Sequence, residues 1–390
     1  MSGYDLLKGV RVLEVAALGP SSLGGYLADM GADVVKVETG AGDGLRYQGS
    51  PAMGSPQGES LLHLRWNRGK RSIVIDLKSD EGRDLFLALA DKADVVIEGM
   101  RAGVLDRLGL GYDALRKRRP AIVFCSLSGF GSYGPYAEMG SHAPSFDAFA
   151  ALLATNPYAL TKEERAASNA NPIGMHAMGL YAATGTLAAL IKARATGEGT
   201  RLEVAATDCA VNWLPDVIDA ELNREQCFER PGFYGAKGRQ AGWARLWIYR
   251  TRDGRGLFFQ AIMPRFWDRF CATVERPDLA GAYQTDREVN TVDDEVHAKL
   301  EALFATRDFA DWMALCEAAD VPAGPAHSLP TLIEDPHFLA RDSFYLVDMA
   351  QGGTLRLTGT PVKVDGQAFA PNLAPRAGAD ETAIRADWLG

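Results

Sequence analysis

Residues 13–38, LEVAALGPSSLGGYLADMGADVVKVE, decide the fold of this chain. The first residues of this stretch belong to an apolar, β-branched run at residues 10–15, and a Gly19-Pro20 turn follows soon after it. This pattern is typical of a short buried strand. A helical stretch follows the turn, and residues 32–38 form a second β-branched run. A strand, a helix and a strand over so short a distance make a βαβ unit, which implies a parallel sheet with a right-handed crossover.

Short apolar runs and helical stretches keep alternating along the chain. Further strands are expected at residues 73–77, 93–97, 121–126 and 201–204. Residues 174–195 are apolar nearly all round, which predicts a buried helix. The alternation predicts an α/β fold, with a doubly wound parallel sheet in the larger domain.

The chain changes character after residue 223, where a charged, Gly-rich stretch begins. Beyond it, residues 246–251 and 256–261 are expected to pair as antiparallel strands around an Asp-Gly turn. Residues 321–325 predict a turn, and the tail from residue 366, rich in Pro, Ala and Gly, predicts an extended chain. The predicted organisation is a large domain at 1–223, a linker at 224–240, a smaller α+β domain at 241–325 and a return segment at 326–390 that packs on the large domain.

Composition limits the class of protein. The 390 residues carry a net charge of -9, whereas a nucleic-acid partner would favour a basic surface. The five cysteines are dispersed without a CxxC pair, which predicts reduced thiols and a cytoplasmic protein. No histidine pair has metal-type spacing and no run reaches the roughly 18 apolar residues of a membrane span, so neither a metal nor a membrane is expected.

Three turns are expected to line one cleft, because ligands bind outside the carboxyl ends of parallel strands. These turns are residues 16–20, 98–103 and 128–135. The first lacks a GxGxxG fingerprint, and no GxxxxGK[ST] is present, so a dinucleotide or nucleotide-triphosphate loop is not indicated. A phosphate-bearing ligand is still compatible with the basic residues near this edge, which are Lys70, Arg71, Arg101 and Arg107.

Five segments stand in the order and spacing of a known family. They are ADMGADVVKVE (28–38), NRGKRSIVIDLKSDEGRDLF (67–86), ADVVIEGMRAGVLDRLGLGYDAL (93–115), SLSGFGSYGPY (126–136) and DVPAGPAHSLPTLIEDPHFLARDSF (320–344). The chain resembles the class III CoA-transferases of the CaiB/BaiF type, which include formyl-CoA, carnitine and benzylsuccinate CoA-transferases and the α-methylacyl-CoA racemases. The resemblance implies a Rossmann-like large domain, a small domain and two interlocked subunits.

The same resemblance implies that CoA or an acyl-CoA is the ligand, held by the large domain. The positions that it assigns to CoA are Ala17 and Leu18 near the thioester and pantetheine, Lys70 and Arg71 near the phosphates, Gly99 and Met100 through their backbone, and Arg107 at a phosphate.

The catalytic position of the family is where this sequence departs from it. In the transferases an aspartate just before a G-M-H helix start attacks the thioester, and a carboxylate suits that covalent exchange. Counting back from the G-M-H at residues 174–176 puts Ala170 at this position, between two asparagines. Neither an alanine nor an amide is a useful nucleophile, so the catalytic residue of this chain is unknown.

The racemase pattern is incomplete as well. Racemases of the family pair that aspartate with a histidine that precedes another Asp, and here the corresponding pair is Phe146-Asp147. His142 and Asp147 are the weak substitutes for an acid–base. The alternative interpretations are a surface or turn histidine for His142 and a helix cap or internal acceptor for Asp147.

Three hypotheses follow. The first is a class III family protein that acts on or binds an acyl-CoA, with CoA transfer between carboxylic acids of the succinyl-CoA:benzylsuccinate type. Because of Ala170, it is either a silent subunit of a hetero-oligomer or an enzyme with a displaced carboxylate. The second is a 2-methylacyl-CoA racemase or isomerase with a displaced acid–base, and the third is a CoA-binding protein without activity. The expected partners are an acyl-CoA, a carboxylic acid and a second subunit, in a homodimer or a heterodimer.

Overall fold

The structure is a computed structural model that describes residues 3–50, 59–152, 161, 172–213, 215–226, 244–280, 294–349 and 353–390. The chain divides into two compact units, Met1–Pro215 with Arg341–Gly390 and Asp216–Ala340. Most of the predicted linker at 224–240 lies outside the described residues, so the predicted domain boundaries stay predictions.

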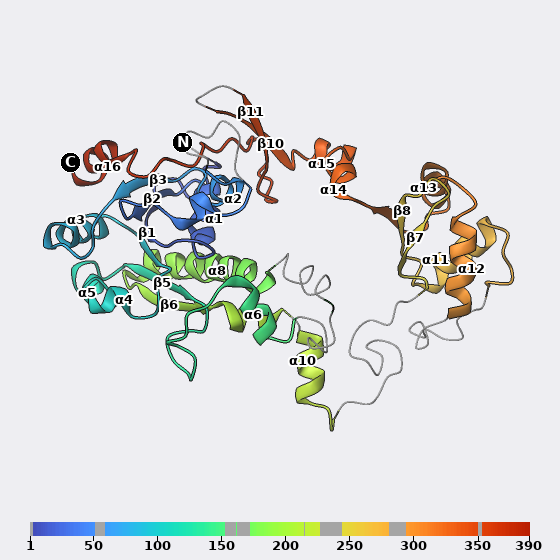
Figure 1. Ribbon diagram of the computed structural model, residues 1–390, viewed down its shortest axis with the longest axis horizontal. Helices are drawn as coiled ribbons and strands as arrows, with labels where there is room; N and C mark the ends of the chain where they lie inside the picture. Colours follow the sequence, from blue (N-terminus) through green and yellow to red (C-terminus); the bar gives the residue numbers. More distant parts are fainter. Residues whose placement is uncertain are drawn as a thin grey trace. The chain divides into compact units, whose positions relative to one another are not determined.

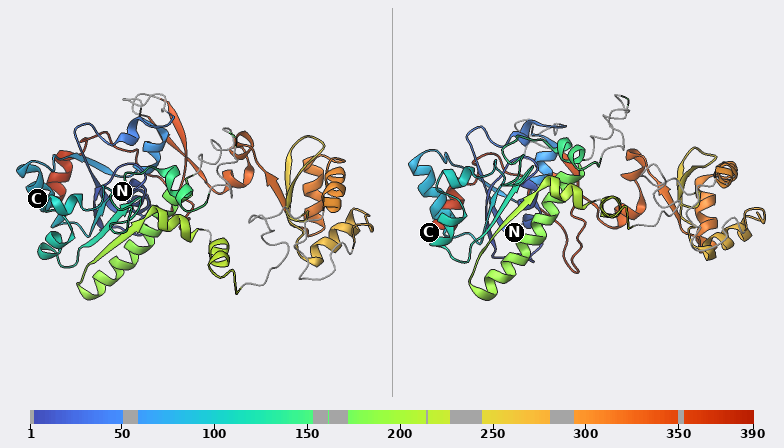
Figure 2. Two further views of the ribbon diagram at one scale, coloured as in Figure 1. Left: turned by 60° about the horizontal axis from the view of Figure 1, so that its bottom comes forward. Right: turned by 90° about the horizontal axis from the view of Figure 1, so that it is seen from below.

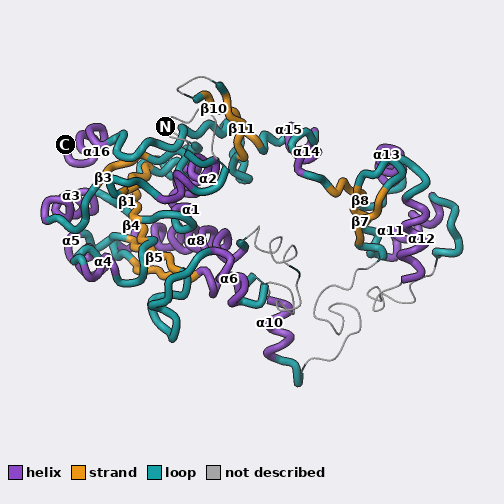
Figure 3. The backbone as a smooth tube through the Cα atoms, in the orientation of Figure 1, coloured by secondary structure: helices purple, strands orange, loops and turns teal. Residues whose placement is uncertain are grey.

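A six-stranded parallel sheet forms the centre of the first unit (Figures 1 and 3). Its strands are β1 Arg11–Val15, β2 Asp33–Glu38, β3 Arg71–Val74, β4 Val95–Glu98, β5 Val123–Ser128 and β6 Thr200–Ala205. The order β3-β2-β1-β4-β5-β6 reverses direction between β1 and β4, which opens a crevice at their carboxyl ends. The predicted α/β class with a parallel sheet is confirmed, and all six predicted strands are present.

Helices cover both faces of this sheet because its strands are apolar on both sides. Val12 packs in a core with α1 and α8, whereas its neighbour Leu13 packs in a second core with α3, α5 and α16. Among the described residues, the helices of the first unit up to β6 are α1 Ser21–Asp29, the 3-10 helix η1 Gly44–Tyr47, α2 Leu61–Trp66, α3 Asp80–Ala90, α4 Val104–Arg107, α5 Tyr112–Arg118, α6 Ala143–Phe149 and α8 Ile173–Thr196. The later ones are α9 Ala206–Asn212, α10 Pro215–Leu222, which runs into the second unit, and α16 Glu381–Leu389.

The long helix α8, light green in Figure 2, has the length and apolar composition of a membrane span. One side packs against α1, α9, β5 and β6, and burial of that side in the core accounts for much of its apolar character. The other side exposes Leu180, Tyr181 and Ile191, the last at 71%. The prediction of a helix buried all round is therefore wrong for the single chain, which buries one face only.

The second unit has a hydrophobic core of its own, built around Trp267, Phe304 and Trp312. Its elements after α10 are β7 Trp247–Arg250, β8 Gly256–Phe259, α11 Pro264–Thr273, α12 Asp294–Phe304, α13 Phe309–Ala318, β9 Ala323–Ala326, α14 Leu329–Leu332 and α15 Pro336–Ala340. The predicted antiparallel pair β7–β8 is confirmed. The predicted turn at residues 321–325 is wrong, because β9 pairs with β8 as a third strand.

The chain then returns to the first unit. A hairpin forms there from β10 Phe344–Asp348 and β11 Thr354–Thr358. Helix α16 packs against β3, and its Trp388 donates a hydrogen bond to Asp33 (2.7 Å). The prediction of an extended tail from residue 366 is therefore wrong for α16.

Candidate functional site

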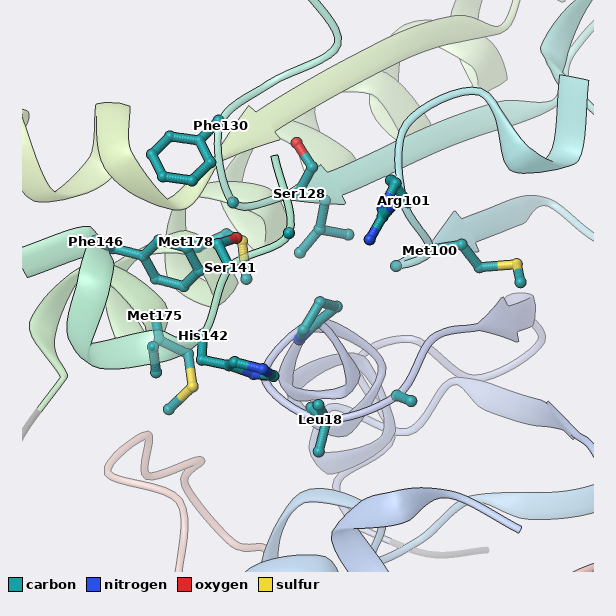
Figure 4. Close-up of a pocket in the computed structure, with 18 of the residues that line it drawn as sticks. Leu18, Met100, Arg101, Ser128, Phe130, Ser141, His142, Phe146, Met175 and Met178 are labelled. Carbon is teal, nitrogen blue, oxygen red and sulfur yellow. The ribbon is translucent and has the colours of Figure 1, made fainter. Parts of the chain in front are cut away.

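A pocket of about 830 Å³ opens where β1, β4 and β5 end (Figure 4). Residues 17–20, 99–102 and 127–130 supply its walls, and residues 137 and 139–144 with Met175 and Met178 of α8 close one side. The pocket lies at the point where the strand order reverses, which is where open α/β sheets bind ligands. The three turns that the sequence predicted for one cleft thus meet in one pocket.

The pocket walls are mainly apolar. Figure 4 shows Phe146, Met175 and Met178 grouped on one side, with Met100 and Arg101 on the other. The polar side chains in the wall are Arg101, His142, Gln48, Ser128 and Ser141. No carboxylate occurs among the described lining residues, so the wall favours an apolar ligand that carries negative charge.

The turn after β1 has an unusual backbone. Leu18 has φ +57°, a left-handed conformation that costs a non-glycine residue about 1–2 kcal/mol. Its N–H donates to Asp43 Oδ1 (3.3 Å), which ties the turn to the loop before η1. Such strain persists only where surrounding contacts hold it, and it is common at ligand sites.

The turn after β4 comes very close to the turn after β1. A Cβ on Gly99 would lie 2.5 Å from Pro20 Cβ and 2.7 Å from Ala16 Cβ, so only glycine fits. The predicted residues Ala17, Leu18, Gly99 and Met100 are thereby brought together in the pocket wall. Their contact with CoA stays a prediction.

Glu98, the last residue of β4, anchors the turn that follows this strand. Its buried carboxylate accepts hydrogen bonds from Leu105 N (3.1 Å) and Ser126 Oγ (2.8 Å). Burial raises the pKa of Glu98, although the two hydrogen bonds oppose the shift. The residue therefore fixes the loop between β4 and α4 without facing the pocket.

Arg101 is the one Lys or Arg side chain in the described wall of the pocket. Its guanidinium is exposed and makes no hydrogen bond or ion pair with the described part of the chain. Figure 4 shows its nitrogen atoms directed toward the pocket. Arg107 is exposed at the last residue of α4, outside the pocket wall, and donates weakly to Ala102 O (3.4 Å).

The structure does not bring Lys70 to the pocket wall. Its ammonium is buried and donates to both oxygens of Glu14 (2.9 and 2.8 Å), to Ser21 O (2.7 Å) and to Asn67 Oδ1 (3.0 Å). Burial lowers the pKa of Lys70 to about 8, against the attraction of Glu14. In this conformation the ammonium is not available to a phosphate.

Arg71 is also engaged within the chain. Its guanidinium forms a bidentate pair with Asp33 (2.9 and 2.6 Å) and a second ion pair with Asp387 of α16 (2.7 Å). The side chain starts at the first residue of β3, at the amino end of the sheet, whereas the pocket opens at the carboxyl ends. Arg71 thus tethers α16 to the sheet edge.

The two weak acid–base candidates are placed differently. Asp147 is 3% exposed, and its two oxygens accept hydrogen bonds from Ile173 N (2.8 Å) and Gly174 N (2.7 Å). It therefore caps the first turn of α8, where a negative charge suits the helix dipole. His142 is exposed and its imidazole faces the pocket (Figure 4).

Ala170, the position expected for the catalytic aspartate, lies outside the described residues. The segment that carries it leads directly into the α8 terminus that Asp147 caps. Four residues of the pocket wall were not predicted from the sequence, namely Phe130, Phe146, Met175 and Met178. A signal for Phe130 was present, since the loop after β5 was expected to line the cleft.

With this geometry, the comparisons with known proteins identify the class of the protein. The profile of CoA-transferase family III matches residues 7–381, and the chain belongs to this family. The chain is similar to a crystallised CaiB/BaiF family protein from Brucella suis, with a TM-score of 0.76 and 27% identity over 98% of this chain and 99% of the other.

Two of the proteins similar to this chain are named as CoA-transferases of stated substrates. The chain is 29% identical over 370 residues to a cinnamoyl-CoA:phenyllactate CoA-transferase of Clostridium sporogenes, covering 92% of this chain and 87% of that protein. It is 28% identical over 397 residues to the alpha subunit of a succinyl-CoA–L-malate CoA-transferase of Chloroflexus aurantiacus, covering 98% of this chain and 85% of that one. The names of both relatives specify a CoA thioester as a substrate.

Proposed function

We propose that this chain binds an acyl-CoA in the pocket at the ends of β1, β4 and β5 and serves as a subunit in the transfer of CoA between carboxylic acids. The observation that carries the proposal is the pocket itself, with its apolar walls, the guanidinium of Arg101 and its position at the reversal of strand order. An acyl-pantetheine is largely apolar and CoA carries phosphates, so this combination suits both parts of the ligand.

The chain is proposed to be the catalytically silent member of its assembly. Ala170 provides no nucleophile. Asp147 is buried, holds two backbone N–H groups and is not among the described lining residues of the pocket, so its carboxylate is not presented to a bound thioester. One relative is named as an alpha subunit, which supports an assembly of two different chains. A related subunit with the aspartate would interlock with this one and complete the site, and the exposed apolar side of α8 offers surface for such a partner.

Binding can be tested without turnover. Isothermal titration of the purified chain with CoA and with succinyl-CoA should give measurable affinity, and Arg101→Gln should raise the Kd about tenfold, since a charge-assisted bond to a phosphate or carboxylate is lost. Arg194→Gln is the matched control, because Arg194 is an exposed arginine in the last turn of α8, at the far end of that helix from the pocket. Equal effects of the two substitutions would contradict a role for the pocket.

The silent-subunit hypothesis is tested by Ala170→Asp. The unaltered chain alone should not move CoA from succinyl-CoA to benzylsuccinate or phenyllactate, whereas Ala170→Asp should form a hydroxylamine-sensitive acyl-enzyme, because a carboxylate then occupies the family's nucleophile position. Transfer by the unaltered chain alone would remove the silent-subunit hypothesis. A hydroxylamine-sensitive species in the unaltered chain would favour a displaced carboxylate.

One observation favours a second candidate function. His142 faces the pocket and could move the α-proton of a bound 2-methylacyl-CoA. Deuterium incorporation at the α-carbon in D₂O that disappears in His142→Gln would support a racemase or isomerase. If no deuterium is incorporated and CoA binding is intact, two hypotheses remain: a CoA-transferase subunit, or a CoA-binding protein that has no activity.

A further inference from the structure

We propose that Asp43 is a positioning residue of the pocket, whose carboxylate holds the turn at residues 16–20 in the shape that meets the thioester end of an acyl-CoA. The inference rests on the proposed function and deepens it, because it says which buried group sets the geometry of the pocket wall. Asp43 is not itself among the lining residues, so it acts through the backbone of the turn.

The turn needs an external support. Leu18 is held at φ +57° although a leucine disfavours this conformation, and the neighbouring residues 17, 19 and 20 all line the pocket. A change of the Leu18 backbone to a more common conformation would move these residues together. The conformation of one residue therefore determines a whole side of the pocket.

Asp43 supplies that support with both oxygens. Its Oδ1 accepts hydrogen bonds from Leu18 N (3.3 Å) and Leu45 N (2.9 Å), and its Oδ2 accepts one from Ser21 Oγ (3.4 Å). Oδ2 also forms an ion pair with the ammonium of Lys36 (2.9 Å). The carboxylate thus joins the turn, the start of α1, η1 and β2.

A second layer of buried charge fixes the carboxylate in turn. Lys36 Nζ donates to Ala16 O (2.5 Å), which begins the same turn, and to Glu14 Oε1 (3.1 Å). Glu14 in turn pairs with Lys70, and Gly24 of α1 leaves room for it, since a Cβ there would lie 1.8 Å from Glu14 Oε2. The four side chains are at most 1% exposed. Buried ion pairs of this kind tolerate little rearrangement, because each charge depends on its partners.

A purely structural role is the alternative, and a matched variant separates the two. Asp29 is also a buried carboxylate of the first unit, paired with Arg68 (2.7 and 2.5 Å), but it does not touch the pocket or its turns. Asp29→Asn should lower stability as Asp43→Asn does, without altering the pocket. The decisive comparison is therefore ligand affinity at equal loss of stability.

The first measurement is the Kd of succinyl-CoA for the full chain. Asp43→Asn should raise it at least tenfold and Asp29→Asn less than twofold. Glycine adopts the left-handed conformation freely, so a Leu18→Gly chain does not need Asp43 to hold its turn. Adding Asp43→Asn to Leu18→Gly should therefore raise the Kd less than threefold over that of Leu18→Gly alone. Asp43→Glu keeps the charge opposite Lys36 but displaces the carboxylate, and it replaces Asp43→Asn if that variant does not fold.

The second measurement does not depend on the ligand. Amide hydrogen exchange of the peptide spanning residues 13–22 should accelerate in Asp43→Asn and stay unchanged in Asp29→Asn. Equal Kd changes in both variants, or an equally large Asp43→Asn effect with glycine at position 18, would overturn the inference. If the unaltered chain does not bind succinyl-CoA, the proposed function fails, and unchanged exchange in Asp43→Asn would then overturn the positioning role separately.

Discussion

His63 is a fully buried histidine of α2 that interacts electrostatically with Arg46, Asp43 and Lys36. Its Nδ1 lies 3.0 Å from Asn67 Nδ2, and its Nε2 has no hydrogen-bond partner in the described structure. Burial, with a smaller contribution from the Arg46 guanidinium, lowers the pKa of His63 to about 3. The folded chain therefore keeps His63 neutral at every pH where a cell operates.

This burial predicts acid sensitivity. The unfolded chain protonates His63 near its ordinary pKa of 6.5, whereas the folded chain does so only near 3, so stability should fall as the pH drops below about 6.5. The loss from this group approaches at most about 1.4 kcal/mol per pH unit. Urea unfolding of the first unit at pH 7 and pH 5 should show a smaller pH dependence in His63→Gln than in the unaltered chain. The exposed His142 provides the control, and an effect of His142→Gln as large as that of His63→Gln would contradict the assignment.

Asp147 is expected to be a cap and not a catalyst. Asp147→Asn retains one acceptor for the N-terminus of α8 but loses the second and the charge, which should cost about 1–2 kcal/mol in urea unfolding. Asp208→Asn is the control, because Asp208 is an exposed acid in the first turn of α9, and its effect should stay below about 0.5 kcal/mol. Unchanged stability of Asp147→Asn with loss of CoA-dependent activity would instead mark Asp147 as catalytic.

Lys70 shows why part of the site could not be predicted from sequence. A lysine next to an arginine in a basic motif suggests an exposed side chain that binds phosphate. Inside the fold, however, the Lys70 ammonium donates to both carboxylate oxygens of Glu14, which lies 56 residues earlier. The turn residues Leu18 and Gly99 could be predicted because strand ends fix their place. Met175 and Phe146 could not, because their position depends on how α6 and α8 pack.

At the scale of elements, α16 is the clearest departure from the sequence prediction. Its nine residues, Glu381–Leu389, follow a stretch whose Pro and Gly content indicates an extended chain. The local signals for a helix are short, namely the i,i+4 ion pair of Glu381 and Arg385 (2.8 Å) and the i,i+4 spacing of Ile384 and Trp388. Contacts distant in sequence complete its stabilisation: Ile384 and Trp388 enter the core of the sheet face that also contains Phe86. The central strands could be predicted from local sequence alone, because strands that are buried on both faces of a parallel sheet are continuous β-branched, apolar runs.

Trp388 should therefore carry much of the attachment of α16. The indole is 2% exposed, donates to Asp33 and lies against the Arg11 guanidinium (5.4 Å). Trp388→Ala should cost about 3–5 kcal/mol, and Trp388→Phe, which loses mainly the hydrogen bond, about 1 kcal/mol. Limited proteolysis and urea unfolding of the full chain would measure both. Asp387→Ala is the control, because that carboxylate is 61% exposed and its ion pair should contribute below about 1 kcal/mol. An Asp387 effect equal to that of Trp388→Ala would contradict a packed helix.

At the scale of the whole molecule, the chain carries separate hydrophobic cores. The cores on the two faces of the sheet lie within residues 1–215 and 341–390, whereas the core around Trp312 lies entirely within residues 216–340. Trp312 is fully buried and donates to Phe304 O (2.9 Å), much as Trp388 is anchored in the first unit. Units with independent cores generally fold and unfold as separate cooperative bodies.

Two matched tryptophan variants should separate these bodies. Hydrogen-exchange mass spectrometry in increasing urea should give one transition for peptides of residues 216–340 and another for the rest of the chain. Trp312→Ala should move the first transition to lower urea, since a large core side chain is removed from that unit alone, and Trp388→Ala should move the second. A single transition that either substitution shifts in full would mean that the units unfold together. In that case, a core substitution in the second unit would also lower the stability of the first unit, which holds the pocket.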